Sequence, residues 1–570
     1  MKIKKGGNTW SISLVPAVRC NNGSRVFLYH EKVVKPVKAA EAIVKFLVEE
    51  GVDTVFGYPG GYIVHVYEAL RKSGIRHVLV RQESAAAHSA NGYARVSGKT
   101  GVCIATSGPG ATNLITAIAT AYMDSIPLVV LTGQVPSSMI GRDVFQEVDI
   151  TGATDSFTKH NYLVKDASQL PRIFREAFHI ASTGRPGPVL IDLPHDIQTE
   201  DIPYDYPETV HISGYKPTFK GHMGQIKRAL KAISESERPL ILAGGGVNLS
   251  GAHAELLTFS EKSGIPVVHT LMGKGAFPSN HPHYAGMIGT HGFSYANEAV
   301  RKADLMIFIG ARIADRTAGG TQILPENMRI VHIDVDPAEI GKIVGTHIPL
   351  VGDVKEILRQ MNEKIKRKNT DAWLETLKGM KTEETYLTGS LVNPKKAVRL
   401  LSDKLSDNAI MVADVGQNQF WAARHFEDLP GRKFMTSGGM GTMGYGIPAA
   451  VGAKIAAPDR QVVAVTGDGG FQMSLFELGT IASNQIDLLM VLFNNSNLGM
   501  VREMQHRMFG KTSHTALEKN PDFVMLARAY GINGVRVHKD EDLESAFDQA
   551  LSHKGPFLVE CIVDPDERTL

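Results

Sequence analysis

The chain has 570 residues, which is too long for one hydrophobic core and indicates three or four domains. Its 61 basic and 59 acidic residues nearly balance, so the net charge gives no reason to expect nucleic acid or an anionic membrane as a partner. The cysteines, Cys20, Cys103 and Cys561, lie far apart, which argues against a disulfide framework or a cysteine zinc cluster and fits a cytoplasmic protein.

Residues 1–35 read as an N-terminal extension that we expect to be loosely ordered. Its first 30 residues contain basic side chains but no acidic one. This bias is typical of organelle transit peptides, yet the stretch is not rich in Ser or Arg and lacks the apolar core of a signal peptide. No apolar run in the chain reaches the roughly 18 residues of a membrane helix. We therefore expect a cytoplasmic protein without a membrane partner, with organelle targeting as the alternative.

From residue 36 onward, short runs rich in Val, Ile and Leu alternate with segments of helical periodicity. This alternation is typical of parallel sheets covered by helices on both faces. An irregular linker and a charged segment interrupt the pattern between residues 203 and 218 and again between 361 and 387. The sequence thus predicts the α/β fold class, with three doubly wound parallel-sheet domains over residues 36–203, 218–361 and 387–570.

In the third of these domains, polar residues follow two strands that a helix connects. GDGG (467–470) ends one strand and NNSN (494–497) ends the next. Ligands of open parallel sheets bind at the carboxyl ends of strands, so Asp468 and Asn495 should emerge at one edge. A carboxylate and a carboxamide suit Mg²⁺, which completes its shell with phosphate oxygens and water. Two ordinary turns are the alternative, because Asp-Gly and Asn-Asn are favoured turn residues, but the order GDG, helix, strand, NN favours a metal–diphosphate site.

This arrangement resembles the thiamine diphosphate (ThDP) motif. Nearly the whole chain from about residue 36 resembles the catalytic large subunit of acetohydroxyacid (acetolactate) synthase. The segments that carry the resemblance are FGYPGG (56–61), SGPGATN (107–113), TGQVPSSMIGRDVFQE (132–147), TLMGKG (270–275), SGGMGTMGYGIPAA (437–450) and LGMVR (498–502). The resemblance implies that the three domains are, in order, a pyrimidine-binding, a central FAD-binding-like and a diphosphate-binding domain.

The resemblance further implies Mg²⁺ ligands at Asp468, Asn495 and Asn497, the last through its carbonyl. It implies a ThDP site made of Pro59, Val415, Gly416, Gln417, Asn418, Gly441, Met443, Gly469, Gly470 and Met500. Without the resemblance, Met443 would be interpreted as a core residue. In the ThDP site, a bulky Met beneath the cofactor would force the two rings of ThDP into a V-shaped conformation.

Glu83, at the start of the helix 83–98, matches the family's catalytic glutamate. Such a carboxyl stabilises the imino tautomer of the aminopyrimidine, whose own nitrogen then removes the C2 proton. On its own, Glu83 would be interpreted as an acid that interacts with a helix dipole. In the family this glutamate and the metal site face each other across a subunit boundary, which implies a homodimer or homotetramer. A separate regulatory subunit is a further candidate partner.

The family's substrate pocket and flavin site also map onto this chain. Catalytic roles are implied for Gln146 and Arg316 beside Glu83, and substrate contacts for Phe145, Lys159 and Met504; the guanidinium of an Arg suits a 2-ketoacid carboxylate. A non-redox FAD is implied at Gly244, Gly245, Gly246, Thr270, Leu271, His291, Arg312, Asp315, Asp334 and Asp353. Three positions depart from the family pattern, namely Thr290, Ala314 and Met504, where relatives have Met, Asp and Trp.

The implied reaction is a decarboxylating carboligation. Pyruvate loses CO₂ and its remaining two carbons attack a second 2-ketoacid, which gives 2-acetolactate or, from 2-ketobutyrate, 2-aceto-2-hydroxybutyrate, in branched-chain amino acid biosynthesis. Alternatives in the same architecture are pyruvate oxidase, a ketoacid decarboxylase, sulfoacetaldehyde acetyltransferase or a flavin-free acetolactate synthase. A non-catalytic ThDP-binding scaffold is the alternative from another class, and the retained Glu83, Asp468 and Asn495 argue against it.

Overall fold

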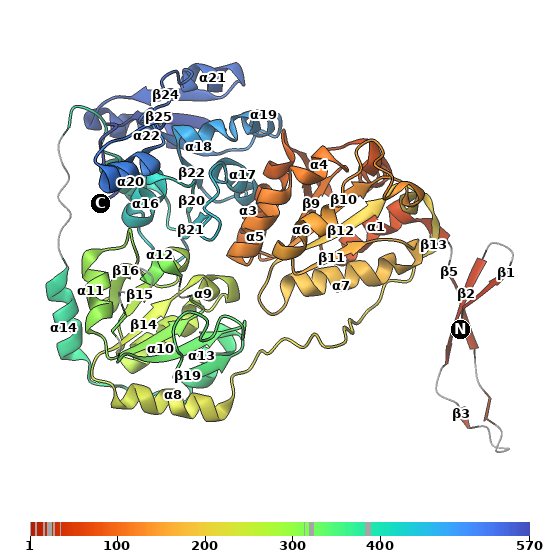
Figure 1. Cartoon of the computed structure of the whole chain (residues 1–570), viewed down its shortest axis with the longest axis horizontal. Helices are drawn as coiled ribbons and strands as arrows, with labels where there is room; N and C mark the ends of the chain where they lie inside the picture. Colours follow the sequence, from red (N-terminus) through yellow and green to blue (C-terminus); the bar gives the residue numbers. More distant parts are fainter. Residues whose placement is uncertain are drawn as a thin grey trace. The chain divides into compact units, whose positions relative to one another are not determined.

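The computed structural model describes residues 2–5, 8–14, 18–19, 25–26, 29–34, 36–312, 314–318, 324–325, 327–381 and 389–570. The chain divides into two compact units (Figure 1). Unit 1 comprises Met1–Ala90, Lys99–Ser182 and Pro186–Gly214, and unit 2 comprises Asn91–Gly98, Thr183–Arg185 and Tyr215–Leu570. None of the helices within the described ranges is long and apolar enough to cross a membrane.

Strands, rather than irregular chain, occupy the described parts of the N-terminal extension. β1 (Lys2–Lys5), β2 (Asn8–Leu14) and β5 (Tyr29–Val34) form an antiparallel sheet in the order β1-β2-β5, and β3 (Val18–Arg19) pairs with β4 (Arg25–Val26). The expectation of loose order missed the alternation of apolar and polar residues in NTWSISL, which has the period of two that strands require.

Unit 1 is built on a six-stranded parallel sheet in the order β11-β12-β10-β9-β7-β8. Its strands are β7 (Thr54–Gly57), β8 (Arg76–Leu79), β9 (Gly101–Ala105), β10 (Leu128–Gln134), β11 (His160–Leu163) and β12 (Pro188–Pro194). The main helices are α1 (Ala39–Glu49), α2 (Val64–Arg71), α3 (Glu83–Ser97), α5 (Ile115–Asp124) and α7 (Leu170–Ser182). Every residue of β10 and β12 is buried, as expected of central strands covered on both faces.

Unit 2 contains two further six-stranded parallel sheets. The central sheet has the order β16-β15-β14-β17-β18-β19. Its strands are β14 (Pro239–Ala243), β15 (Val267–His269), β16 (Tyr284–Met287), β17 (Leu305–Ile309), β18 (Arg329–Asp334) and β19 (Ile348–Val351). Its helices are α8 (Met223–Glu235), α9 (Gly245–Ser250), α10 (His253–Ser263), α11 (Ser294–Lys302), α12 (Asp315–Ala318), α13 (Val354–Asn362) and α14 (Asp371–Met380).

The third sheet has the order β21-β20-β22-β23-β25-β24 and is also parallel. Its strands are β20 (Ile410–Ala413), β21 (Lys433–Thr436), β22 (Val462–Gly467), β23 (Leu489–Asn494), β24 (Asn533–Val537) and β25 (Phe557–Ile562). Its helices are α15 (Pro394–Lys404), α16 (Gln417–His425), α17 (Gly446–Ala456), α18 (Asp468–Gln472), α19 (Leu478–Ser483), α20 (Gly499–Phe509), α21 (Phe523–Ala529) and α22 (Leu543–Ser552). Three parallel sheets flanked by helices confirm the predicted fold class.

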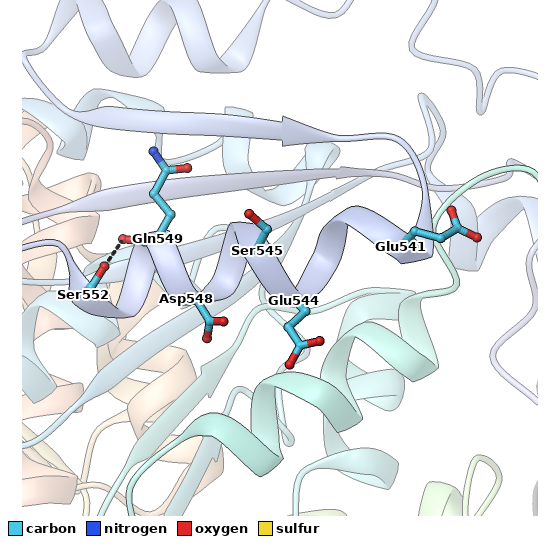
Figure 2. A pocket seen from close by; sticks show the side chains of 6 residues that line it. All are labelled: Glu541, Glu544, Ser545, Asp548, Gln549 and Ser552. Carbon is cyan, nitrogen blue, oxygen red and sulfur yellow. Dashed lines mark hydrogen bonds between the residues drawn. The ribbon is translucent and has the colours of Figure 1, made fainter.

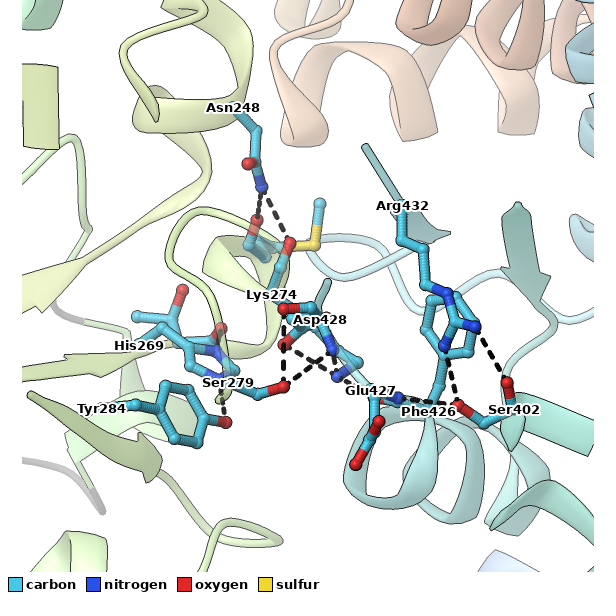
Figure 3. A network of polar contacts seen from close by, with 12 residues as sticks. Asn248, His269, Lys274, Ser279, Tyr284, Ser402, Phe426, Glu427, Asp428 and Arg432 are labelled. Atoms are coloured by element: carbon cyan, nitrogen blue, oxygen red, sulfur yellow. Dashed lines mark hydrogen bonds and ion pairs between the residues drawn. The ribbon is translucent and has the colours of Figure 1, made fainter. Parts of the chain in front are cut away.

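A buried ion pair joins the segment after β15 to the segment after α16, both in unit 2 (Figure 3). Lys274 Nζ lies 2.9 Å from the Asp428 carboxylate and donates to the carbonyl of Phe426 at 2.7 Å. The side chains of Lys274 and Asp428 are only 3% and 2% exposed. Ser279 extends the network, since the Asp428 N–H donates to its hydroxyl at 3.1 Å. Each charge therefore has a partner, without which its burial would be costly.

We expect the Lys274→Ala substitution to lower the free energy of unfolding by about 3–5 kcal/mol, because it leaves the Asp428 carboxylate buried without its cation. Lys378→Ala is the matched control: Lys378 is 77% exposed and its pairing with Glu375 is loose, at 3.9 Å. Losing that exposed pair should change the unfolding free energy by less than about 1 kcal/mol. Denaturant unfolding of both variants measures the difference, and equal losses would show that the buried pair does not stabilise the fold.

Candidate functional site

The carboxyl ends of β20 and β22 form a topological switch point in the third sheet. The chain passes from β20 to β21 on one side and then to β22 on the other side of β20. Open parallel sheets bind ligands at such points. The predicted diphosphate residues gather here: residues 415–418 follow β20, and Gly469 and Gly470 lie in α18 directly after β22. A Cβ on Gly470 would approach the Asp414 carboxylate to 2.9 Å, which shows how closely the two segments pack.

The predicted metal ligands lie at this same edge. Gly467 is in register with Phe493 on the neighbouring strand, which places Asp468 beside Asn494 and Asn495. Asn520 bridges the two segments, because its Nδ2 donates to Asp468 Oδ2 at 2.7 Å and to Asn494 Oδ1 at 3.2 Å. Asn497 donates its backbone N–H to Asn495 Oδ1 at 3.1 Å. The structure therefore brings Asp468, Asn495 and Asn497 together.

The chemistry of this donor set fits Mg²⁺. Asp468 is only 2% exposed, and burial raises the pKa of its carboxyl to about 6. The carboxylate, the carboxamide oxygen and a backbone carbonyl are hard oxygen ligands. Across the described residues, no group of three or more His, Cys, Asp or Glu side chains could hold a metal ion. Mg²⁺ held by these oxygen ligands would complete its shell with phosphate oxygens and water, as it does in diphosphate sites.

Met443 and Gly469 lie together, as the predicted ThDP site requires. A Cβ built on Gly469 would lie 3.3 Å from Met443 Cε and 2.9 Å from Leu498 Cδ2. Gly416 has a φ of 144°, a conformation that side chains disfavour, and it leads directly into α16. Both glycines thus allow the backbone to pass closely between neighbouring groups at the switch point.

Asp414 is a residue of this site that the sequence reasoning missed. Its side chain is fully buried and accepts hydrogen bonds from the Val415 N–H at 2.6 Å, the Gly444 N–H at 3.0 Å and the Thr466 hydroxyl at 3.4 Å. Burial raises the pKa of this carboxyl to about 6. Through these hydrogen bonds, Asp414 joins the ends of β20 and β22 to the loop that carries Gly441 and Met443. The signal was an acid directly after a buried strand, the same signal that identified Asp468.

In unit 1, four predicted residues lie in loops or at a helix start at the carboxyl edge of its sheet, where β7 and β9 form the switch point. They follow β7, β8 and β10 and are Pro59, Glu83, Phe145 and Gln146. Asn113 Nδ2 donates to Glu83 Oε2 at 2.8 Å, which fixes the carboxylate at the start of α3. Phe145 is 78% exposed, and its carbonyl accepts a hydrogen bond from Tyr62 Oη at 3.3 Å. An apolar ring so exposed suits contact with a ligand or a second chain.

Lys159 does not join this group. It precedes β11 and so lies at the amino edge of the sheet, where its Nζ donates to the carbonyl of Ile180. The prediction of a substrate contact for Lys159 therefore gains no support from the fold. His195 instead follows β12 at the carboxyl edge, and its ring centroid lies 4.8 Å from that of His65. Sequence reasoning missed both histidines, although His195 directly follows a buried strand.

The predicted flavin residues lie at the carboxyl edge of the central sheet, whose switch point is between β14 and β17. They occupy the ends of its strands and the segments that follow them, including the start of α9: Gly244–Gly246 after β14, Thr270 and Leu271 after β15, His291 after β16, Arg312 after β17, Asp334 in β18 and Asp353 after β19. A Cβ on Gly244 would lie 2.2 Å from the carbonyl oxygen of Gly310. Burial raises the pKa of Asp334 to about 6 and lowers that of His291 to about 4.

Some of these flavin residues already have partners. Thr270 accepts from the Gly273 N–H at 3.0 Å, Asp353 caps α13 by accepting from the Glu356 N–H at 3.0 Å, and His291 stacks on Phe420. Asp315 begins α12, and its side chain lies outside the described residues.

The predicted substrate residues of unit 2 are exposed. Arg316 lies on α12 and Met504 on α20, a helix with no buried residue. Met500, predicted for the ThDP site, is half-buried on the same helix. Met508 and Phe509 on α20 are each 65% exposed. The end of α20 is therefore an apolar surface, in keeping with a wall for a small organic substrate.

A hollow along α22 is unsuited to the predicted ligands (Figure 2). It is lined by Glu541, Glu544, Ser545, Asp548, Gln549 and Ser552. Glu544 and Asp548 each pair with Lys404, at 3.3 and 2.6 Å. Carboxylates outnumber cations here, so the hollow would repel a diphosphate or a ketoacid.

Asp192, buried in β12, makes the stability of the protein depend on pH. Burial raises the pKa of its carboxyl to about 7, although Thr132 Oγ1 and Gln134 Nε2 donate to it at 2.7 and 2.9 Å. The folded state therefore binds this proton more tightly than the unfolded chain, whose Asp pKa is about 3.9. Stability from this group falls as the pH rises from about 4 to about 7 and stays low above that range.

We expect Asp192→Asn to gain stability relative to the unmutated protein as the pH is raised from about 5 to about 8, since the carboxamide does not ionise. Its oxygen can accept from Gln134 Nε2, while its Nδ2 can donate to the Thr132 hydroxyl. Denaturant unfolding at the two pH values measures the difference in unfolding free energy between the variant and the unmutated protein, with Asp53→Asn at an exposed position as control. A difference that does not change with pH would contradict the assigned titration.

Comparison with known proteins agrees with the site. Three domain models of thiamine pyrophosphate enzymes match this chain. The N-terminal TPP binding domain matches residues 37–153, the central domain residues 226–361 and the C-terminal TPP binding domain residues 414–561. The "Probable acetolactate synthase large subunit" of Methanocaldococcus jannaschii is 47% identical over 93% of each chain. The "Acetolactate synthase" of Arthrospira platensis is 45% identical over 94% of this chain and 96% of its own. The "Acetolactate synthase isozyme 3 large subunit" of Escherichia coli K12 is 43% identical over 90% of this chain and 92% of its own. The chain therefore belongs to the acetolactate synthase large-subunit family of thiamine pyrophosphate enzymes.

Proposed function

We propose that the chain forms 2-acetolactate from pyruvate with ThDP and Mg²⁺, and that it accepts 2-ketobutyrate as an alternative second substrate. The observation that carries the proposal is the set of Asp468, Asn495 and Asn497 at the carboxyl ends of β22 and β23, next to the β20–β22 switch point. The names of the relatives support the reaction assigned to it. In the cell this reaction would serve branched-chain amino acid synthesis in the cytoplasm.

Asp468, the Oδ1 atom of Asn495 and the carbonyl of Asn497 would hold Mg²⁺ against the diphosphate. The backbone of residues 415–418 and of Gly469 and Gly470 would surround the phosphates, and Met443 would support the space between the two rings. When bound, ThDP supplies the carbanion chemistry that decarboxylation of a 2-ketoacid needs. The residues of the chain bind it, orient it and exclude water.

Glu83 would hold a proton at N1′ of the aminopyrimidine, and Asn113 keeps its carboxylate in place through the 2.8 Å hydrogen bond. As the family resemblance implies, this glutamate would serve a cofactor held by another chain, so the proposal includes a homodimer or homotetramer. The relatives are named large subunits, which supports a separate regulatory subunit as a further partner.

In unit 2, Arg316 would bind the carboxylate of the ketoacid and Met504 would contact the acceptor. Phe145 and Gln146, in unit 1, would serve a substrate held by another chain, as proposed for Glu83. Met504 is unbranched and flexible, so the wall it forms would adapt to acceptors that differ by one methylene. We include a non-redox FAD at the carboxyl edge of the central sheet, where Gly244 allows the segment after β14 to pack closely against Gly310 at the switch point.

Competition between pyruvate and 2-ketobutyrate tests the substrate assignment. The purified chain is incubated with both ketoacids, ThDP and Mg²⁺, with FAD added or withheld, and the products are identified. We expect acetolactate and acetohydroxybutyrate, formed faster with FAD. Acetaldehyde, or acetyl phosphate with H₂O₂, would assign the chain to a decarboxylase or an oxidase instead.

A further inference from the structure

Gln417 lies at the centre of a hydrogen-bond chain that starts far from the metal site in sequence. Its Nε2 donates to Glu503 Oε2 at 3.0 Å and to the carbonyl of Glu567 at 2.9 Å. Its Oε1 accepts from Asn495 Nδ2 at 3.0 Å. Glu503 lies on α20, Glu567 lies in the segment 565–569 that follows β25, and Asn495 follows β23, so three separate parts of the chain meet at this side chain.

The donors and acceptors around Gln417 permit only one orientation of its carboxamide. A carboxylate and a carbonyl accept hydrogen bonds and donate none, so the Nε2 atom must face Glu503 and Glu567. The Oε1 atom then faces Asn495, which must present its own Nδ2. The oxygen of the Asn495 carboxamide is thereby directed to the other side, where it accepts from the Asn497 N–H.

The segment 565–569 in turn fixes Glu503. The Thr569 hydroxyl donates to both carboxylate oxygens of Glu503, at 2.9 and 3.1 Å, and its N–H donates to Oε2 at 3.2 Å. Thr569 is fully buried. Trp421 Nε1 donates to the carbonyl of Arg568 at 3.1 Å, and Lys395 pairs with the Glu567 carboxylate at 3.1 Å. The segment is thus held at several points on the third domain.

The start of α20 has no room for a side chain in this network. A Cβ on Gly499 would lie 1.9 Å from Gln417 Oε1 and 2.8 Å from Asn495 Nδ2. The glycine allows the backbone of α20 to pass against the hydrogen bond between Gln417 and Asn495. This close packing leaves little freedom for either carboxamide to rotate.

We propose that Glu503 and Thr569 are positioning residues of the cation site: through Gln417 they set which atom of the Asn495 carboxamide faces the metal. The inference rests on the proposed function, because it assumes that Asn495 Oδ1 binds Mg²⁺. Partners that orient a ligand in this way are worth about 10- to 100-fold in metal affinity. Neither Glu503 nor Thr569 touches the cation or the substrate in this assignment.

Mg²⁺ titration by isothermal calorimetry, with ThDP present in excess, tests the proposal without measuring turnover. We expect Glu503→Ala to weaken Mg²⁺ binding about 10- to 100-fold. Thr569→Val, which keeps the shape but removes the hydroxyl, should weaken it in the same direction, and Thr569→Ser should restore it. In a Gln417→Ala background, Glu503→Ala should cause little further loss, because both changes break one chain of contacts.

Arg507→Ala is the matched control, since Arg507 is an exposed residue on the same helix, and it should leave Mg²⁺ affinity unchanged.

Asp468→Asn separates this inference from the proposed function. If Asp468→Asn abolishes Mg²⁺ binding while Glu503→Ala and Thr569→Val bind it normally, the positioning role is wrong and the metal site stands. If Asp468→Asn itself binds Mg²⁺ normally, both the metal site and the positioning role are overturned.

Discussion

Asp468→Asn will abolish Mg²⁺-dependent binding of ThDP and, with it, the formation of acetolactate from pyruvate. Asp468 supplies the one negative charge among the three assigned ligands, so its loss leaves the cation with carboxamide and carbonyl oxygens only. The expected drop in Mg²⁺ affinity exceeds the roughly 100-fold that the loss of a supporting residue causes. Calorimetric titration of Mg²⁺ and an acetolactate assay measure the two effects.

The same substitution should leave the metal-free fold intact. Asn520 Nδ2 still finds an oxygen on the introduced carboxamide, and burial disfavours the charge of the natural carboxylate, whose pKa it raises to about 6. Asp459→Asn, at an exposed position of the same domain, removes an equal charge and should bind the cofactors normally. Normal Mg²⁺ and ThDP binding by Asp468→Asn would contradict the assigned ligand set.

Glu83→Gln will lower the rate of acetolactate formation by about 10²- to 10⁴-fold, the usual contribution of a proton-transfer group. The introduced carboxamide can still accept the hydrogen bond from Asn113, so the loop geometry should persist. It can no longer hold an exchangeable proton at the aminopyrimidine. Initial rates with saturating pyruvate measure the loss, and calorimetry should show that ThDP and Mg²⁺ still bind.

Glu68→Gln serves as the control for Glu83→Gln. Glu68 lies in the same unit, is half exposed and pairs with Arg71 and Lys72 on one helix face. Its substitution should leave the rate unchanged. A rate for Glu83→Gln equal to that of Glu68→Gln would remove Glu83 from the catalytic role.

The sequence predicted most of the third domain because its signals are local. Each buried strand reads as a short apolar run, and the polar residue after it lies at the carboxyl edge of the sheet, as Asp468 and Asn495 do. The order of the strands needed the structure, since sequence periodicity does not show that β20 and β22 are neighbours. Asp414 carried the same local signal as Asp468, an acid directly after a buried strand, but its contacts with Gly444 and Thr466 depend on the strand order.

The remaining differences also come from contacts between distant residues. Lys159 was assigned from a match along the chain, and only the fold shows that it lies at the amino edge of its sheet, while His195 lies at the edge that carries Glu83. The network of Gln417, Glu503 and Thr569 likewise joins residues that are widely separated in sequence. No periodicity or motif reports such contacts, because they depend on how the strands and helices pack.

Acetolactate formation is the claim on which the roles of Asp468 and Glu83 depend, and product identification tests it most directly. The purified chain is incubated with pyruvate, ThDP and Mg²⁺, and the carbon products are identified by mass spectrometry. The expected product is 2-acetolactate, formed with release of CO₂ and lost when Mg²⁺ is removed. Acetaldehyde or acetyl phosphate as the main product, or no consumption of pyruvate, would contradict the assignment.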